Sequence, residues 1–201
     1  MTNIYLIQKS TGAIQRVTVL NYVYIYLSSI IRTEIITKIR TMPLVYLLFG
    51  GNQGDRDEII SEAIDLVTSN IGTKMSCSSR YESESWGFNS EPFMNQVIAL
   101  ETTLSPDEIL ERVHRIETQL GRTRKTNQYE ARTIDIDLLY IDSLIVRSPH
   151  LTIPHPKISL RRFVLVPLAE IAPDLLDPAT GSTVIDMLAN CSDTGYVRRI
   201  V

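Results

Sequence analysis

The sequence predicts an α+β fold in which helices pack on a mainly antiparallel sheet. From residue 42 onward, the hydrophobic pattern alternates in the order strand, helix, strand, loop, strand, helix, loop, strand. The first expected strand is a continuous apolar run, as in a central strand buried on both faces, and each of the two helices is apolar on one face. Elements in this order are typical of a ferredoxin-like α/β sandwich.

The composition describes one globular domain with an extension. The chain has 201 residues, of which 44% are hydrophobic and 21% charged, and these values are ordinary for a globular protein. The net charge of −3 argues against general nucleic-acid binding. Cys77 and Cys191 lie far apart in the sequence and give neither a metal-binding spacing nor a disulfide framework, so a reducing cytoplasm is the expected location.

Residues 1–41 differ in character from the rest of the chain. They contain an apolar run, 17–31, but polar residues such as Asn21 and Ser28 interrupt it, whereas a transmembrane helix needs about 20 apolar residues. No small-residue cleavage site comes after the run, so a signal peptide is not expected. We expect 42–201 to be the functional domain. Residues 1–41 are then either an accessory, disordered extension or upstream sequence read through from a misplaced start, and composition fits both.

The first strand, 44–50, ends at a glycine-rich turn. The sequence GGNQG at 50–54 allows a tight turn and a close approach of the backbone to a ligand. No Gly-Lys-Ser/Thr follows, so this is not a nucleotide-binding P-loop, and a simple strand-to-helix turn is favoured. Asp55 is a suitable N-cap for a helix over 57–69, whose apolar residues fall on one face.

A strand over 74–81 and a long loop over 82–92 come next. Loops of this length inside compact domains often have a function, and Trp86, the only tryptophan, lies in the middle of this one. A tryptophan in a loop usually packs locally. The alternative is that it forms an aromatic wall for a planar ligand.

The following strand, 93–103, places Phe93 and Asn95 on the same face. A ring beside an amide can stack on a heterocycle and hydrogen-bond its edge. The alternative is a core phenylalanine and a capping asparagine, and these two residues taken alone favour that alternative.

The second helix has clear boundary signals. Ser105 is a typical N-cap, Pro106 occupies the first helical position, and Glu108 completes a capping box. Gly121 ends the helix, and the polar residues 122–131 lead into the next strand.

The strand over 132–140 carries the most informative pattern. Side chains alternate along a strand, so Asp135 and Asp137 share one face, with Cα atoms roughly 6–7 Å apart, while the apolar residues around them face the core. Carboxylates at this spacing suit Mg²⁺, which at protein sites usually accompanies a substrate polyphosphate.

A cluster of cations precedes this strand. It consists of Arg122, Arg124, Lys125 and Arg132. Carboxylates for metal beside guanidiniums for phosphate indicate phosphoryl transfer. An Asp-x-Asp pair alone more often marks the solvated end of a strand, and a basic run alone a solvated loop, but the two features together favour a site.

The remainder of the chain is expected to form short elements. We expect a strand over 144–146, an extended segment over 151–156 in which prolines flank His155, and short helices over 172–177 and 184–188. The sequence has no repeat and no low-complexity segment.

Seven stretches occur in an order that is typical of one enzyme family. They are FGGNQGDR (49–56), SRYESESWGF (79–88), PFMNQVIALET (92–102), RIETQLGRTR (115–124), ARTIDIDLLY (131–140), LTIPHP (151–156) and RRFVLVPLAEIAP (161–173). Through them, residues 44–188 resemble the 6-hydroxymethyl-7,8-dihydropterin pyrophosphokinase family (2-amino-4-hydroxy-6-hydroxymethyldihydropteridine diphosphokinase) of folate biosynthesis. Residues 1–41 lie outside the resemblance.

The resemblance implies a ferredoxin-like fold and transfer of pyrophosphate from ATP to the pterin hydroxymethyl group, with release of AMP. It implies that Asp135 and Asp137 hold two Mg²⁺ ions and that Arg122 and Arg132 are catalytic residues on the transferring phosphates. The residues implied to bind the pterin are Ser83, Trp86, Phe93, Asn95 and Phe163, with the rings of Phe93 and Phe163 on either side of it and the backbone of the 83–87 loop completing the pocket. Those implied to bind ATP are Glu117, Arg124, His155 and Arg161. The segments 50–54, 82–92 and 122–132 would close over ATP.

The expected partners are the two small-molecule substrates, ATP and the hydroxymethyl-dihydropterin, with no nucleic acid and no membrane, and the expected state is a monomer. The chain departs from the family before the acidic strand, where QYEA at 128–131 replaces the frequent Arg-Trp-Gly-Pro. This departure affects the contacts of that loop rather than the metal site.

Two other functions are compatible with parts of the pattern. A different metal-dependent nucleotidyl or glycosyl transferase would use the Asp-x-Asp pair without the Phe93 and Phe163 rings. A ferredoxin-like RNA-binding module would need exposed strand aromatics and a basic sheet face, and the sequence indicates neither.

Overall fold

The computed structural model describes residues 4–8, 14–18, 42–122 and 131–200. The chain divides into two compact units, Met1–Thr41 and Met42–Val201, and each is described by itself. In the first unit, strands β1 (Ile4–Gln8) and β2 (Ile14–Thr18) form an antiparallel pair. Most of the apolar run at 17–31 lies outside the described residues.

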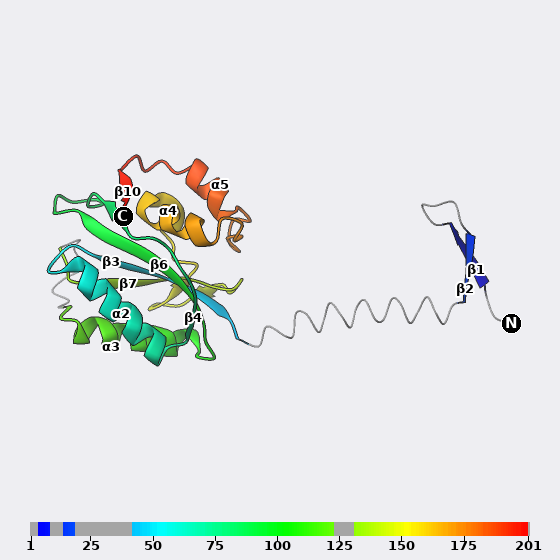
Figure 1. Cartoon of the computed structure of the whole chain (residues 1–201), viewed down its shortest axis with the longest axis horizontal. Helices are drawn as coiled ribbons and strands as arrows, with labels where there is room; N and C mark the ends of the chain where they lie inside the picture. The colour runs from blue at the N-terminus through cyan, green and yellow to red at the C-terminus, as the bar shows by residue number, and fades with distance from the viewer. Residues whose placement is uncertain (1–3, 9–13, 19–41, 123–130, 201) are drawn as a thin grey trace. The chain divides into compact units, whose positions relative to one another are not determined.

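A six-stranded antiparallel sheet forms the centre of the second unit (Figure 1). Its strands are β3 (Leu44–Gly51), β4 (Thr73–Cys77), β5 (Tyr81–Ser83), β6 (Phe93–Glu101), β7 (Asp135–Ile141) and β10 (Val197–Arg199). The strand order is β10-β5-β6-β3-β7, and β4 pairs with the far end of β6. The central β3 and its neighbours β6 and β7 thus have the ferredoxin-like arrangement, and the predicted fold class is confirmed.

Helices α2 (Arg56–Asn70) and α3 (Pro106–Gln119) cover one face of this sheet (Figure 1). Both begin as predicted: the Asp55 carboxylate accepts a hydrogen bond from the Glu58 N–H, and Ser105 forms a capping box with Glu108. Their apolar sides pack on the sheet in one hydrophobic core. Its fully buried members are Val45, Leu47, Phe49, Ile60, Ala63, Val67, Ile98, Leu100, Ile109 and Ile134.

Helices α4 (Arg162–Ile171) and α5 (Val184–Ala189) lie on the opposite face (Figure 1). They bury a second core that includes Leu48, Val97, Leu139, Tyr140 and Leu165. A ferredoxin-like unit keeps its two crossover helices on one face, so this second helical layer is an addition that the alternating pattern did not reveal. The remaining elements are β8 (Val146–Arg147), β9 (Thr152–Ile153) and the 3₁₀ turn η1 (Ile158–Leu160).

The strand predicted at 74–81 is divided into β4 and β5. Between them, the Ser78 hydroxyl accepts a hydrogen bond from the Val97 N–H at 3.0 Å and donates to the Ser79 carbonyl at 2.8 Å. This side chain takes over contacts that a continuous backbone ladder would make, so the regular strand stops there.

Two predictions for the second half were wrong. Residues 142–144 form a tight turn, with Asp142 at a φ of 42° and the Leu144 N–H donating to the Ile141 carbonyl, so the strand predicted at 144–146 begins only at Val146. The helix predicted at 172–177 is absent because two of its carbonyls, those of Pro173 and Leu175, accept hydrogen bonds from the start of α5.

The helix predicted at 184–188 is confirmed as α5, whereas β10 was not predicted. Among the described residues, no helix has the length and apolar character needed to cross a membrane.

Candidate active site

An open pocket with about 530 Å³ of empty space lies on the α4 side of the sheet. Its lining residues are Leu48, Gly50, Ser83, Glu84, Trp86, Phe88, Phe93, Asn95, Arg132, Asp135, Asp137, Arg161 and Phe163. A concave lining in which aromatic side chains lie beside a few polar and charged groups is typical of small-molecule sites. The lining contains all five residues predicted to bind the pterin and both predicted metal ligands. Of these seven residues, the first and the last in the sequence are Ser83 and Phe163, so distant segments meet at one site.

Three neighbouring strands form the floor of this pocket. Gly50 in β3 lies opposite Asn95 in β6 and opposite Asp135 in β7. A Cβ atom at Gly50 would lie 3.4 Å from the Asn95 side-chain oxygen, so the glycine keeps the space between amide and carboxylate open. The sequence favoured a simple strand-to-helix turn after β3, and the structure shows that Gly50 also lines the pocket.

Asp135 and Asp137 point to the same side of β7, as their spacing predicts. The side chain of Asp135 is 23% exposed and that of Asp137 is 27% exposed, whereas Ile136 and Leu138 between and beyond them are buried in the core on the α2 side. The alternation of a regular strand thus separates the carboxylates from the apolar residues.

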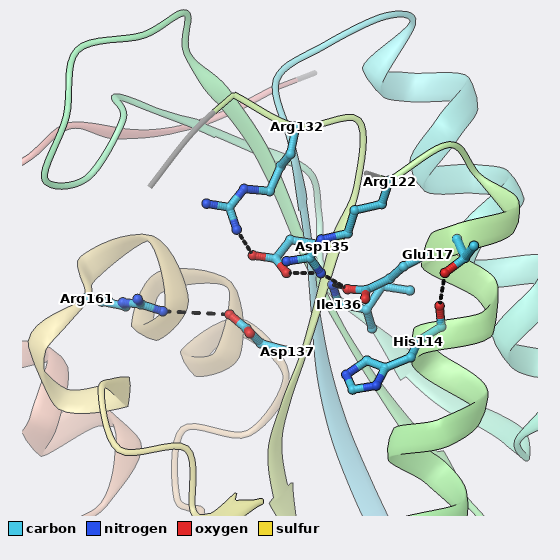
Figure 2. A network of polar contacts seen from close by, with 9 residues as sticks. His114, Glu117, Arg122, Arg132, Asp135, Ile136, Asp137 and Arg161 are labelled. Carbon is cyan, nitrogen blue, oxygen red and sulfur yellow. Dashed lines mark hydrogen bonds and ion pairs between the residues drawn. The ribbon is translucent and has the colours of Figure 1, made fainter. Parts of the chain in front are cut away.

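Arginine side chains surround the two carboxylates. Figure 2 shows Arg122 and Arg132 both reaching Asp135, with Arg122 Nη1 at 2.6 Å from Asp135 Oδ1 and Arg132 bonded to the other oxygen. Arg161 Nη1 lies 3.7 Å from Asp137 Oδ2. The guanidiniums come from the end of α3, the start of β7 and the start of α4, so the positive charge is assembled from distant parts of the sequence.

The two carboxylates are close enough to affect one another electrostatically. Burial, followed by the charge of Asp135, raises the pKa of Asp137 to about 7, and the positive charge of Arg161 opposes this. A pair of carboxylates that resists full ionisation is stabilised by a bound cation. With two acidic ligands, most of the coordination of a Mg²⁺ ion is left for water and substrate oxygens, which is the usual form of a Mg²⁺ site.

Glu117 lies beneath the pocket rather than in its lining. Its carboxylate is 2% exposed, accepts a hydrogen bond from the Ile136 N–H at 2.8 Å, and pairs with Arg122 (Figure 2). Glu117 therefore ties α3 to the strand between the two aspartates and orients Arg122.

The other end of the pocket is aromatic. The Asn95 amide donates to the Ser83 hydroxyl at 2.9 Å, and the Phe88 and Phe93 rings meet edge to face with centroids 6.0 Å apart. The Arg161 guanidinium carbon lies 4.9 Å from the Trp86 ring centroid and 5.5 Å from that of Phe163. Arg161 therefore spans both ends of the pocket, between the rings and Asp137.

Like Glu117, His155 was predicted to bind ATP and does not line this pocket. His155 is half-buried beside it, where burial and then the positive charge of Arg161 lower its pKa to about 4, so the ring is neutral at neutral pH. Arg124 lies outside the described residues.

Sequence reasoning missed several residues of the site. Leu48 of β3 and Phe88 of the 82–92 loop line the pocket, and Asn52 lies just outside it. Glu84 also lines the pocket, and it belongs to the 83–87 segment whose backbone the resemblance implied to complete it. The loop itself was expected to be functional, and Asn52 lies in the glycine turn, but its contacts are with segments 38 and 80 residues away. No local pattern predicts such contacts.

An antiparallel α+β domain with paired carboxylates, guanidiniums and aromatic rings in one pocket is the arrangement of a transferase that handles a polyphosphate and a flat second substrate. The family model of 7,8-dihydro-6-hydroxymethylpterin-pyrophosphokinase (HPPK) matches residues 46–173, and the chain belongs to this family.

Curated relatives agree with this assignment. The chain is 44% identical over 137 residues to a 2-amino-4-hydroxy-6-hydroxymethyldihydropteridine pyrophosphokinase of Porphyromonas gingivalis, covering 66% of this chain and 92% of the relative. It is 36% identical over 159 residues to the enzyme of the same name from Methylorubrum extorquens, covering 78% and 99%. The relatives thus match the chain over nearly their whole length.

Solved structures share the fold. The wild-type HPPK-DHPS of Plasmodium falciparum is similar with a TM-score of 0.61 at 14% identity, over 74% of this chain and 44% of that chain. This chain therefore spans less than half of that protein, and the likeness shows the fold alone.

Proposed function

We propose that the chain transfers pyrophosphate from ATP to the hydroxymethyl group of 6-hydroxymethyl-7,8-dihydropterin, giving AMP and the pterin diphosphate, a step of folate biosynthesis. The main support for this proposal is that one pocket contains two kinds of groups. At one end are the charged side chains of Asp135, Asp137 and Arg132, and at the other is an aromatic slot with the Asn95 amide. Membership of the family and the names of its relatives support it.

Asp135 and Asp137 would hold two Mg²⁺ ions, which neutralise the polyphosphate and polarise the phosphorus that is attacked. Arg122 and Arg132 contact Asp135 in this structure and would turn to the transferring phosphates when ATP is present. Their role is to stabilise the charge of the transition state, for which bidentate guanidiniums are suited.

The pterin would lie at the aromatic end. A flat heterocycle stacks well on phenylalanine faces, so Phe93 and Phe163 would hold the ring and Trp86 would close the slot. Asn95 and Ser83, already bonded to each other and buried, would read the polar edge of the ring. A buried amide rejects a ligand edge that leaves it without a partner, and this gives the slot its specificity.

In the reaction, the hydroxymethyl oxygen attacks the β-phosphorus of ATP. The bond between that phosphorus and the oxygen bridging to the α-phosphorus breaks, AMP leaves with the electron pair, and the hydroxyl proton passes to solvent. Among the described residues that line the pocket there is no histidine, and His155 beside it has a pKa of about 4. Positioning and electrostatic stabilisation therefore supply most of the rate enhancement.

Four further side chains would bind ATP or orient a residue that does. Arg161, between the rings and Asp137, would contact the phosphates, and His155 and Arg124 the nucleotide. Glu117 would act from beneath by orienting Arg122.

The remaining proposals concern the whole molecule. We propose a cytoplasmic monomer, in agreement with the free thiols of Cys77 and Cys191. We also propose that residues 42–201 are sufficient for activity, since each described residue that lines the pocket belongs to that unit. A chain that begins at Met42 should have unchanged kcat and KM. Loss of folded protein would show that residues 1–41 are required.

The test is an assay of the purified chain with ATP, Mg²⁺ and the hydroxymethyl-dihydropterin, in which nucleotide products are separated by chromatography. The proposal predicts one AMP for each pterin diphosphate, and no AMP when the pterin is omitted. Formation of ADP would contradict pyrophosphate transfer, and release of free pyrophosphate with a nucleotidylated product would identify a nucleotidyl transferase instead.

A further inference from the structure

Asn52 lies where the chain leaves β3 beside the pocket, and its side chain is buried, with the residue 8% exposed. Its amide contacts two segments that are remote from each other in the sequence. On one side, Asn52 Oδ1 accepts a hydrogen bond from the Arg132 N–H at 2.9 Å, and the Asn52 N–H donates to the Arg132 carbonyl at 3.0 Å. On the other side, Asn52 Nδ2 donates to Ser90 Oγ at 2.8 Å and to the Glu91 carbonyl at 3.0 Å.

The orientation of this amide is fixed by its partners. A backbone N–H can only donate and a backbone carbonyl can only accept, so the Asn52 oxygen must face Arg132 and the nitrogen must face Glu91. Neither a carboxylate nor a hydroxyl supplies an acceptor on one side and two donors on the other. The position is therefore specific for an amide.

The neighbouring glycine keeps the contact with Arg132 close. A Cβ atom at Gly51 would lie 2.2 Å from the Thr133 carbonyl oxygen, so only glycine allows the end of β3 to run against the segment that enters β7. This close approach holds Asn52 in register with Arg132 and leaves its side chain to reach across to Ser90 and Glu91.

The two segments joined by Asn52 belong to the two ends of the pocket. Arg132 is bonded to Asp135 and is proposed to contact the phosphates. Ser90 and Glu91 end the loop that carries Trp86, which is proposed to close the pterin slot. We infer that Asn52 is a positioning residue that couples the two substrate sites, so that ordering of either segment by its ligand orders the other. This inference rests on the proposed function.

The same loop has a second anchor that does not involve Arg132. Arg56 Nη1 donates to the Pro92 carbonyl at 2.8 Å, and Arg56 Nη2 lies 3.3 Å from Glu82 Oε2. Arg56 thus fixes the loop to α2, and it provides a matched control. Its loss loosens the loop without breaking the connection between the loop and the phosphate end.

The coupling is measured by calorimetry with a non-reactive nucleotide, α,β-methylene-ATP with Mg²⁺, and the hydroxymethyl-dihydropterin. The dissociation constant of each ligand is determined alone and with the other at saturation. In the wild-type chain, each ligand should tighten the other about tenfold or more, and by the same factor in both directions.

Asn52→Ala removes the side-chain bonds to Arg132, Ser90 and Glu91 and keeps the backbone bond from the residue 52 N–H to the Arg132 carbonyl. Asn52→Asp keeps the side-chain acceptor for the Arg132 N–H while losing the donors to Ser90 and Glu91. In both variants the coupling factor should fall to near one. The added charge of Asn52→Asp changes the affinity of each ligand alone, but such a change cancels in the ratio of affinities. Arg56→Ala should weaken pterin binding and keep the coupling factor, and Asn70→Ala, an exposed asparagine at the end of α2, should change nothing.

A coupling factor in Asn52→Asp equal to that of the wild type would overturn the inference. An equal loss of coupling in Arg56→Ala would also overturn it, because the loss would then follow from general loosening of the loop. A wild-type chain that binds each ligand without influence on the other would overturn the inference and leave the proposed reaction standing. A wild-type chain that binds neither ligand would overturn the proposed function itself.

Discussion

The two faces of the central sheet are built for different purposes. The face under α2 and α3 is mostly apolar, with Val45, Leu47 and Phe49 of β3 buried completely. Its buried polar groups include Gln96 of β6, which accepts a hydrogen bond from Arg80. The face under α4 and α5 is apolar at one end only. At the other end, where Gly50 lies between Asn95 and Asp135, it is polar and open.

The difference shows how stability and function are separated in one small domain. Apolar burial on the first face contributes to stability along the whole length of the strands. On the second face, the carboxylates lie close together and partly buried, and burial and the charge of Asp135 raise the pKa of Asp137, so ionisation of Asp137 is unfavourable there. The first face therefore stabilises a sheet whose other face carries unfavourable charge, as is common at functional sites.

The strongest test of this comparison replaces a charged side chain on the polar face with a neutral one. Asp137→Asn keeps the shape of the side chain but removes a metal ligand, so kcat/KM should fall by about 10³-fold or more, because the metal contributes several kcal/mol to transition-state stabilisation. The unfolding free energy of the metal-free chain should not decrease. Steady-state kinetics and urea unfolding measure the two quantities. Near-normal turnover would remove Asp137 from the metal site.

A substitution on the apolar face should have the opposite effect: it should lower stability and leave the kinetic constants of the folded chain nearly unchanged. Leu47→Ala creates a cavity in the core under α2 and α3 and should lower the unfolding free energy by about 2–5 kcal/mol. Because Leu47 does not line the pocket, kcat and KM of the folded fraction should stay within about twofold of the wild type. A large loss of kcat in chains that are shown by circular dichroism to be folded would mean that the two faces are not independent.

The smallest expected effect is on the pH dependence of stability. The folded chain retains the Asp137 proton up to pH about 7, whereas an unfolded aspartate releases it near pH 3.8. Folding is therefore linked to proton uptake in this interval, and the unfolding free energy of the metal-free chain should fall as the pH rises from about 4 to about 7. Urea titrations at several pH values should show this slope in the wild type and a flatter one in Asp137→Asn. Equal slopes would assign the effect to other groups.

The parts of the fold that could be predicted from sequence are those with local causes. Alternation along β7 placed Asp135 and Asp137 on one face, and the caps Asp55 and Ser105 marked the starts of α2 and α3. The glycines after β3 favoured only a strand-to-helix turn, so the place of Gly50 in the pocket lining was not predicted.

The parts that could not be predicted depend on contacts between distant segments. The helix expected at 172–177 fails because the carbonyls of Pro173 and Leu175 bond to α5. The second helical layer and the bonds of Asn52 have no periodic or local signal. The resemblance to the family named pocket residues that spacing alone left undecided, such as Phe93 and Asn95, but it did not indicate that Arg161 lies between the rings and Asp137.

The most direct test of the account is to find where the metal binds. Mn²⁺ suits carboxylate sites of the kind that bind Mg²⁺, and it scatters anomalously. A crystal of the chain grown with Mn²⁺ and α,β-methylene-ATP should show anomalous density between the carboxylates of Asp135 and Asp137, with the phosphates toward Arg132. Anomalous density elsewhere, with nucleotide bound away from these two aspartates, would contradict the account.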